Sequence, residues 1–186
     1  HCAWVFLGGL VPDPEGGAPD YRTFLVPRAD LEVDHNWDTL GLRGTGSHDV
    51  TVKDAFVPAY RTHRSKDGFA ATSPGLKLND APLFKLPFGQ IFVRAVSSSS
   101  IGALQGALDA FVDYARVRVS SNTFNRTAED PDVQLVIAES KAAIDEMKTT
   151  LNRNFSVLMS KTRAGEPLDL DERLLFRHQS GQILER

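Results

Sequence analysis

The strongest constraint on the fold is a long stretch of helical periodicity in the second half of the chain. Apolar side chains recur at intervals of three and four residues from Ile137 to Leu158. Asp130 before Pro131 is a typical N-cap followed by proline at the first helical position, and Gly165 is a typical stop signal. The pattern predicts one helix of about 35 residues, roughly 50 Å long at the standard rise per residue. A helix of this length predicts a bundle, often an oligomeric one.

Two further helices are predicted beside it. After Pro87 the apolar residues follow a helical period to a helix end near Arg118. Asp169 and Glu172 form a capping-box pair that predicts the start of a third helix. Small residues in the first of these helices allow close approach of a neighbouring helix or a flat ligand; they are Ser97, Ser98, Ser99, Ser100, Gly102, Ala103 and Gly106. Residues 90–186 are therefore predicted to form a helical bundle domain.

The N-terminal part of the chain predicts strands instead. Short β-rich runs are separated by turn residues, and they cover 4–11, 21–26, 31–33 and 50–57. Their imperfect alternation is typical of a sheet with one buried face, so we expect an antiparallel meander within residues 1–60. Residues 61–89 are rich in proline and glycine and are expected to be a long connecting segment without regular structure. The fold class is therefore α+β, an antiparallel β-domain followed by a helical bundle.

Composition narrows the classes of function. The 186 residues are 41% hydrophobic and carry a formal net charge of −3, so nucleic acid and membrane are poor partners. No apolar run approaches the roughly 18 residues that a membrane span needs. One cysteine, Cys2, and the absence of a Cys/His cluster with metal-ligand spacing indicate a reducing cytoplasm and no metal site.

Both ends of the chain predict that the sequence is a fragment. It opens inside an expected strand without an initiator methionine, and the run 174–186 keeps a helical pattern without a stop signal. We therefore expect any site that this chain helps to build to be incomplete within it.

One motif connects the chain to a known family. A Gly-x-Arg-x-Thr turn at 41–45, within the run 37–47, is followed by a strand that ends in Phe-Val-Pro at 56–58. With the Tyr-x-x-x-Arg segment at 114–118, this resembles the acyl-CoA dehydrogenases and their flavin monooxygenase relatives across essentially the whole chain. The resemblance implies the acyl-CoA dehydrogenase-like fold, here without its N-terminal helical domain and its C-terminal end.

Details of the motif favour the monooxygenase branch. After Arg118 the run 119–124 departs from the continuation typical of the dehydrogenases, whereas 41–48 and 83–90 are most similar to oxygenase components that hydroxylate a phenolic secosteroid in bacterial steroid catabolism. The resemblance implies an oxygenase that uses reduced FMN, or FAD, and O2 through a C4a-hydroperoxyflavin to ortho-hydroxylate a phenol. It further implies a separate flavin reductase as partner and a homotetramer.

Five residues are the candidates for holding the flavin. Arg43 and Arg118 can meet the flavin phosphate bidentately, and Thr45 with Ser47 can add hydroxyl and backbone donors. Trp37 is suited to cover a face or an edge of the ring system. Each has a structural alternative: Arg43 can pair with a carboxylate of the sheet, Thr45 and Ser47 can satisfy the turn alone, and Trp37 can belong to the core.

No catalytic residue is predicted. Adjacent strand residues point to opposite faces, so His48 beside Asp49 is expected to be structural. His35 and His63 are expected to be solvated, His178 lies in the last helix, and His1 adjoins a strand that lines the flavin in the family.

Two alternatives to the oxygenase remain open. One is an acyl-CoA dehydrogenase that keeps FAD and passes electrons onward. The other is a flavin-free oligomeric scaffold, which leaves the polar turn at 43–47 without a purpose.

Overall fold

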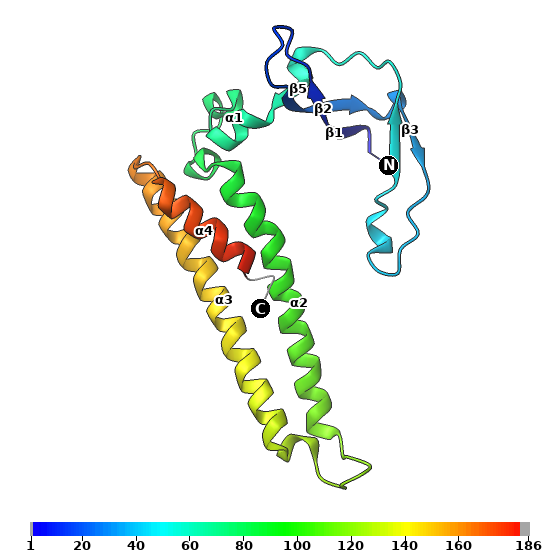
Figure 1. The fold of residues 1–186 in the computed structure, drawn as a ribbon, viewed down its shortest axis with the longest axis vertical. Helices are drawn as coiled ribbons and strands as arrows, with labels where there is room; N and C mark the ends of the chain where they lie inside the picture. Colours follow the sequence, from blue (N-terminus) through cyan, green and yellow to red (C-terminus); the bar gives the residue numbers. More distant parts are fainter. Residues whose placement is uncertain (1, 183–186) are drawn as a thin grey trace. The chain divides into compact units, whose positions relative to one another are not determined.

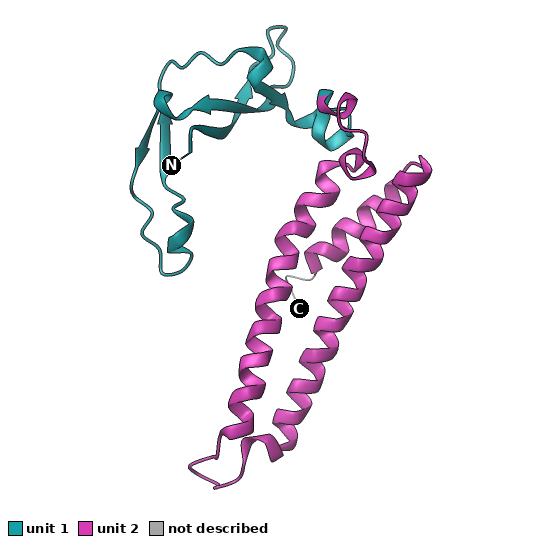
Figure 2. Cartoon of the chain, turned by 180° about the vertical axis from the view of Figure 1, so that it is seen from behind, with its two compact units in different colours: residues 1–74 teal, residues 75–186 magenta. Residues whose placement is uncertain are grey.

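The computed structural model describes residues 2–182 and divides the chain into two compact units. The first unit is His1–Pro74 and the second is Gly75–Arg186 (Figure 2). The boundary lies inside the segment 61–89 that was expected to connect the two domains. Each unit is described by itself below.

Antiparallel strands build the first unit. Its larger sheet has the order β1-β2-β5, in which β1 covers Trp4–Val11, β2 covers Asp20–Pro27 and β5 covers Thr62–Arg64 (Figure 1). The register places Leu10 opposite Tyr21 and Arg22 opposite Arg64. The bounds of β1 are those that the sequence predicts.

A second, two-stranded sheet pairs β3, Leu31–Asp34, with β4, Asp49–Val52. The prediction of one continuous meander is therefore wrong, because β5 rather than β3 continues the first sheet. The strand predicted to extend to residue 57 also ends early. Asp54 has a φ of 50°, a left-handed conformation that interrupts an extended strand.

In the β1–β2 pair, one aromatic side chain lies directly over a glycine. The Tyr21 side chain crosses the strand pair over Gly8, and a Cβ on Gly8 would come within 1.9 Å of Tyr21 Oη. The next glycine, Gly9, has less strict surroundings, because its Cβ would meet the Phe24 ring at 3.3 Å. Gly8 thus lets an aromatic ring lie close to the backbone of its partner strand.

The segment 61–89 contains more structure than the sequence predicts. It includes β5, the short helix α1 at Ser65–Ala70, and two turns of 3₁₀ helix at Pro74–Lys77 and Pro82–Lys85. Other 3₁₀ turns cover Arg28–Asp30, Arg43–Thr45, Ala59–Arg61 and Thr127–Glu129. Proline and glycine at this density therefore mark short elements rather than an unstructured connection.

Three helices form the second unit: α2 at Phe88–Val117, α3 at Pro131–Ala164 and α4 at Leu170–Gln182 (Figure 1). The predicted end signals are confirmed. The Asp130 carboxylate accepts a hydrogen bond from the Asp132 amide at 2.9 Å, and Gly165 ends α3 with a φ of 71°. At α4, the Glu172 amide donates to Asp169 Oδ1 at 2.7 Å and the Asp169 amide donates to Glu172 Oε2 at 3.3 Å.

The core of this unit consists of two apolar clusters. The first joins α2 to α3 through Ile101, Ile144, Met147 and Leu151, and the second joins Leu86, Leu158 and Phe176. Between them, the buried Ser97 hydroxyl donates to the Ser180 carbonyl at 2.6 Å, which brings α2 close to α4. The small residue at position 97 therefore serves close helix packing.

Candidate functional site

Four of the five predicted site residues lie in the loop 35–48 between β3 and β4. Asn36 closes the base of this loop, since its amide nitrogen Nδ2 donates to Asp49 Oδ2 at 2.5 Å and its Oδ1 accepts from the Asp49 amide at 3.1 Å. The Trp37 amide donates to His48 Nδ1 at 3.0 Å. The loop is thus a defined structure rather than an open connection.

The tip of the loop is a tight turn built on two left-handed residues. Leu42 has a φ of 57° and Gly46 a φ of 55°, and they flank one turn of 3₁₀ helix. Thr45 Oγ1 donates to the Leu42 carbonyl at 2.9 Å and lies 2.9 Å from Ser47 Oγ. The turn therefore brings the two predicted hydroxyl groups together on an exposed surface.

Arg43 and Trp37 have partners within the same loop. Arg43 Nη2 pairs with Asp38 Oδ1, and both side chains are exposed to solvent. Trp37 Nε1 donates to the Leu42 carbonyl at 3.1 Å. For Arg43 this is the pairing considered from the sequence, with a carboxylate of the loop in place of one from the sheet.

Arg118 belongs to the second unit, where it caps the C-terminal end of α2. Its amide donates to the Tyr114 carbonyl at 3.0 Å, and its guanidinium lies 5.3 Å from the centre of the Tyr114 ring. An isolated bridge between Val119 and Arg126 closes the loop that follows. Within residues 2–182 no carboxylate is paired with Arg118, so its charge is available to an anionic ligand.

The histidines take structural or peripheral positions. His48 is half-buried, accepts the Trp37 amide and packs edge-on against His35 at 4.7 Å, as a structural role requires. His63 is not simply solvated as predicted, because its Nε2 lies 3.0 Å from Ser73 Oγ. His178 is exposed on α4, and His1 lies outside the described residues.

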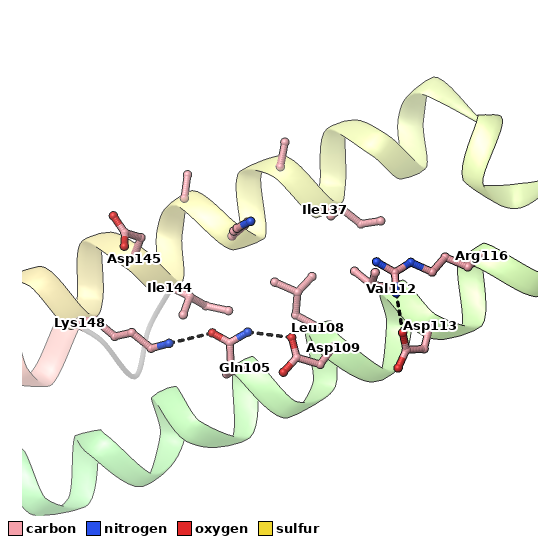
Figure 3. A pocket seen from close by; sticks show the side chains of 13 residues that line it. Gln105, Leu108, Asp109, Val112, Asp113, Arg116, Ile137, Ile144, Asp145 and Lys148 are labelled. Carbon is pink, nitrogen blue, oxygen red and sulfur yellow. Dashed lines mark hydrogen bonds and ion pairs between the residues drawn. The ribbon is translucent and has the colours of Figure 1, made fainter.

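Two grooves run along the α2–α3 pair. The larger, about 960 Å³, is lined by both charged and apolar side chains, and Figure 3 shows a chain of hydrogen bonds from Lys148 through Gln105 to Asp109. The smaller, about 340 Å³, is mostly apolar; its lining includes Leu104, Phe111, Val136 and Met147. Both grooves are open surfaces of the helix pair rather than enclosed cavities.

This unit also contains a buried charge that the sequence does not predict. Arg94 is 1% exposed, and its Nη2 donates to Gln90 Oε1 at 3.3 Å while Nη1 donates to the Gln90 carbonyl. Its guanidinium lies 5.2 Å from the Phe155 ring and 5.6 Å from the Phe176 ring, and Nε has no hydrogen-bond partner among the described residues. Burial lowers the pKa of this guanidinium, and no described carboxylate compensates. A single arginine in a helical period gives no signal of its depth.

Neither a metal site nor a membrane span is present in the part of the chain that the structure describes. There, no group of three or more His, Cys, Asp or Glu side chains is placed to hold a metal ion. None of the described helices combines the length and apolar character of a membrane span.

The second unit matches a known protein family. Residues 95–183 match the model of the acyl-CoA dehydrogenase C-terminal domain. The match covers most of α2 and all of α3 and α4.

Individual relatives match nearly the whole chain. It is 37% identical, over 95% of its length, to the flavin-dependent monooxygenase oxygenase subunit HsaA of Rhodococcus jostii. It is 30% identical, again over 95%, to the oxygenase component of the FADH2-dependent resorcinol hydroxylase of a Rhizobium species. These alignments cover 46% of each relative, so the chain spans about half the length of the curated relatives that it matches.

The same resemblance extends to a solved structure. The crystal structure of the 3-HSA hydroxylase from Rhodococcus sp. RHA1 matches all of this chain and 47% of its own, with a TM-score of 0.87 and 36% identity. The acyl-CoA dehydrogenase-like fold and the resemblance to the flavin monooxygenase branch are thereby confirmed.

Proposed function

Because this chain has the acyl-CoA dehydrogenase-like fold and is similar along its length to oxygenase subunits of flavin-dependent monooxygenases, we propose that it is part of such an oxygenase. The observation that carries the proposal is the 37% identity over 95% of the chain, together with the TM-score of 0.87. The protein uses reduced flavin, FMN or FAD, and O2 to hydroxylate a phenol at the ortho position. Its substrate is a phenolic secosteroid of bacterial steroid degradation.

A two-component arrangement follows from this proposal. A separate flavin reductase supplies the reduced flavin, and the oxygenase subunit binds it. When bound, the flavin activates O2; the protein supplies binding, orientation and exclusion of water. The residues of this chain bind and orient the cofactor, whereas the reaction with oxygen takes place on the flavin.

Two residues of the first unit and, separately, one residue of the second have the chemistry to hold the flavin phosphate. In the first unit, Thr45 and Ser47 present adjacent hydroxyls at the tip of an exposed turn. In the second unit, the exposed Arg118 guanidinium lies over the Tyr114 ring and has no carboxylate partner among residues 2–182. Guanidinium groups and hydroxyl donors are each usual partners of a phosphate group. Arg43 can contact a phosphate only if it leaves Asp38, and Trp37 can offer its ring edge while Nε1 stays bound to the Leu42 carbonyl.

The alternatives have less support. The acyl-CoA dehydrogenase shares the fold and the C-terminal family model, but the relatives matched over 95% of the chain carry monooxygenase and hydroxylase names. The flavin-free scaffold gives no account of the structured turn at 42–47.

The proposal includes assembly and location. The apolar groove on the α2–α3 pair is a surface that a second copy of the protein covers, and the assembly is a homotetramer as the resemblance implies. The protein works in the cytoplasm, without nucleic acid or membrane as partner, in keeping with its net charge of −3.

The test uses the full-length protein. Reduced FMN is titrated anaerobically into the protein, and ¹⁸O2 is then admitted with a phenolic substrate. We expect saturable binding of reduced flavin and a catechol product that carries one ¹⁸O atom. A protein that instead reduces an artificial electron acceptor in the presence of an acyl-CoA supports the dehydrogenase, and a protein that binds no flavin supports the scaffold.

A further inference from the structure

The first unit contains an open cavity at its surface that the proposed function does not use. Its volume is about 500 Å³, and it lies where the β1–β2 turn approaches the junction between β5 and α1. Its charged lining consists of Asp13, Asp20, Arg22, Arg64 and Lys66, and its other walls include Val11, Pro12, Pro14, Pro19 and Tyr21. The cavity therefore combines cations with an apolar and aromatic surface.

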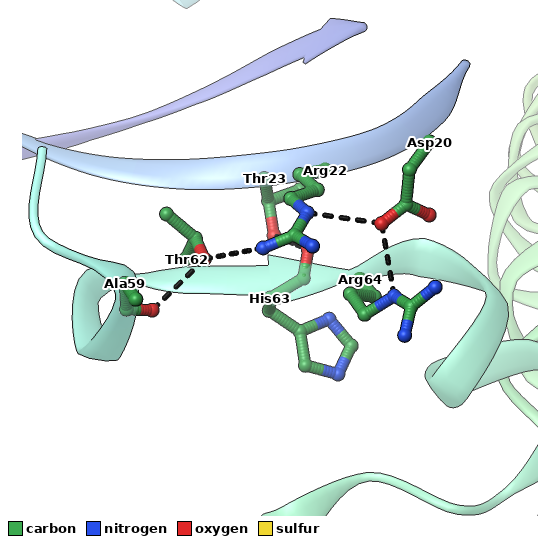
Figure 4. A network of polar contacts seen from close by, with 7 residues as sticks. All are labelled: Asp20, Arg22, Thr23, Ala59, Thr62, His63 and Arg64. Atoms are coloured by element: carbon green, nitrogen blue, oxygen red, sulfur yellow. Dashed lines mark hydrogen bonds and ion pairs between the residues drawn. The ribbon is translucent and has the colours of Figure 1, made fainter. Parts of the chain in front are cut away.

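Two arginines face each other across the sheet beside this cavity. Arg22 of β2 lies directly opposite Arg64 of β5, an arrangement that is destabilising for like charges unless a carboxylate intervenes. Asp20 supplies that carboxylate: its Oδ2 accepts from Arg22 Nε and from Arg64 Nε, each at 2.9 Å (Figure 4). The three side chains form one fixed cluster.

The cluster leaves donors free for a ligand. Asp20 contacts only the Nε position of each guanidinium, and Figure 4 shows the two terminal nitrogens of Arg64 pointing away from Asp20. One terminal nitrogen of Arg22 donates to Thr62 Oγ1 at the long distance of 3.3 Å. The Arg64 side chain remains 40% exposed, so its terminal nitrogens are held in place and accessible.

The charges around the cavity do not cancel. Three cations, Arg22, Arg64 and Lys66, face two carboxylates, Asp13 and Asp20. Asp13 is engaged in the β1–β2 turn, where its Oδ1 accepts the Glu15 amide at 3.0 Å. Burial raises the pKa of Asp20, but the hydrogen bonds and charges of Arg22 and Arg64 outweigh this effect and the pKa lies below its ordinary value. Asp20 is therefore ionised at neutral pH. The charged side chains that line the cavity then carry a net charge of +1.

We propose that this cavity binds the oxyanion group, phosphate or carboxylate, of a small molecule whose apolar body lies against the proline and tyrosine walls. A planar guanidinium with fixed orientation matches two oxygens of either group, and the nearby Lys66 ammonium adds a point charge. The site stands on the first unit alone and does not depend on the proposed oxygenase activity.

The test measures binding to the flavin-free, full-length protein by isothermal titration calorimetry at constant ionic strength. The probes are AMP, benzoate and inorganic phosphate. We expect AMP or benzoate to bind more tightly than inorganic phosphate, and the tighter of the two identifies the oxyanion. Arg64→Gln should weaken that probe about ten- to a hundred-fold.

Matched variants separate the cavity from general charge effects. Lys53→Gln removes a cation of the same unit that pairs with Glu32 at 3.7 Å outside the cavity, and it should leave probe affinity unchanged. Lys66→Gln provides a second test if Arg64→Gln does not fold, as judged by circular dichroism. The proposal is overturned if neither AMP nor benzoate binds the wild type below about 10 mM. It is also overturned if the bound probe keeps its affinity in Arg64→Gln and Lys66→Gln, because the probe then sits elsewhere, for example at the flavin site.

Discussion

Arg43 and Arg118 carry the same charge but differ in what already neutralises it. Arg43 pairs with Asp38, whereas Arg118 lies over the Tyr114 ring without a described carboxylate partner. We therefore expect Arg118→Ala to weaken reduced-flavin binding by roughly 1.5–3 kcal/mol, or about ten- to a hundred-fold. The measurement is an anaerobic titration of reduced FMN against the full-length protein.

Arg43→Ala is the matched variant for this prediction. Its guanidinium must leave Asp38 before it can reach a phosphate, so its loss should weaken flavin binding less than the loss of Arg118. Equal dissociation constants for the wild type and Arg118→Ala, with an unchanged oligomer, would mean that Arg118 has only a structural role.

Arg94 offers a second prediction at this scale. A buried charge without a carboxylate partner costs free energy, so Arg94→Met, which keeps much of the volume, should leave the free energy of unfolding unchanged or raise it by about 1–4 kcal/mol. Arg94→Ala leaves a cavity beside Phe155 and Phe176 and should lower it by about 2–5 kcal/mol. Urea unfolding of both variants checks this, and a large loss in Arg94→Met would show that the charge itself is needed.

At the scale of elements, α3 begins at a cap whose contribution can be measured. Asp130→Ala removes the acceptor for the Asp132 amide and should lower the free energy of unfolding by about 0.5–2 kcal/mol. Glu139→Ala on an exposed position of the same helix is the control, with an expected change within about 0.5 kcal/mol. Similar losses in both variants would argue against the cap.

The stability of the pairing between β2 and β5 should depend on pH. The folded pKa of Asp20 lies below its ordinary value, so the stability that it contributes is present above the unfolded pKa near 4 and is lost as pH falls through the folded pKa. We expect Asp20→Asn to be less stable than the wild type at neutral pH, and this difference to shrink below about pH 4. Thermal unfolding from pH 7 to pH 2 tests it; a difference that stays constant to pH 2 would exclude Asp20 as its source.

Local signals in the sequence were enough to predict some elements and not others. The bounds of α3 follow from Asp130, Pro131 and Gly165, because caps and stops act within one turn of the helix. The pairing of Arg22 with Arg64 depends on a register between strands about 40 residues apart, which periodicity does not specify. The candidate site divides in the same way: the Thr45–Ser47 turn follows from its own residues, whereas the Asp38 partner of Arg43 depends on the path of the loop.

At the scale of the whole molecule, exposed apolar side chains on α2 and α3 predict self-association. Leu104 and Val136 line the apolar groove and are 41% and 52% exposed. We expect the full-length protein to sediment as a tetramer, and the double variant Leu104→Glu and Val136→Glu to shift towards smaller species. Leu170→Glu, exposed on α4 outside that groove, should leave the assembly unchanged. Sedimentation of the wild type as a monomer at micromolar concentration would contradict this.

The strand order β1-β2-β5 has a consequence for the sequence of folding events in the first unit. β1 and β2 are joined by a short turn and can pair early, whereas β5 reaches β2 only after a loop of more than 30 residues closes, which costs chain entropy before any contact forms. We expect hydrogen exchange during refolding to protect β1–β2 amides before those of β5. Asp20 and Arg22 would then be in place on a preformed hairpin, and Arg64 would arrive last, so that the cavity between them is completed only when this unit has finished folding.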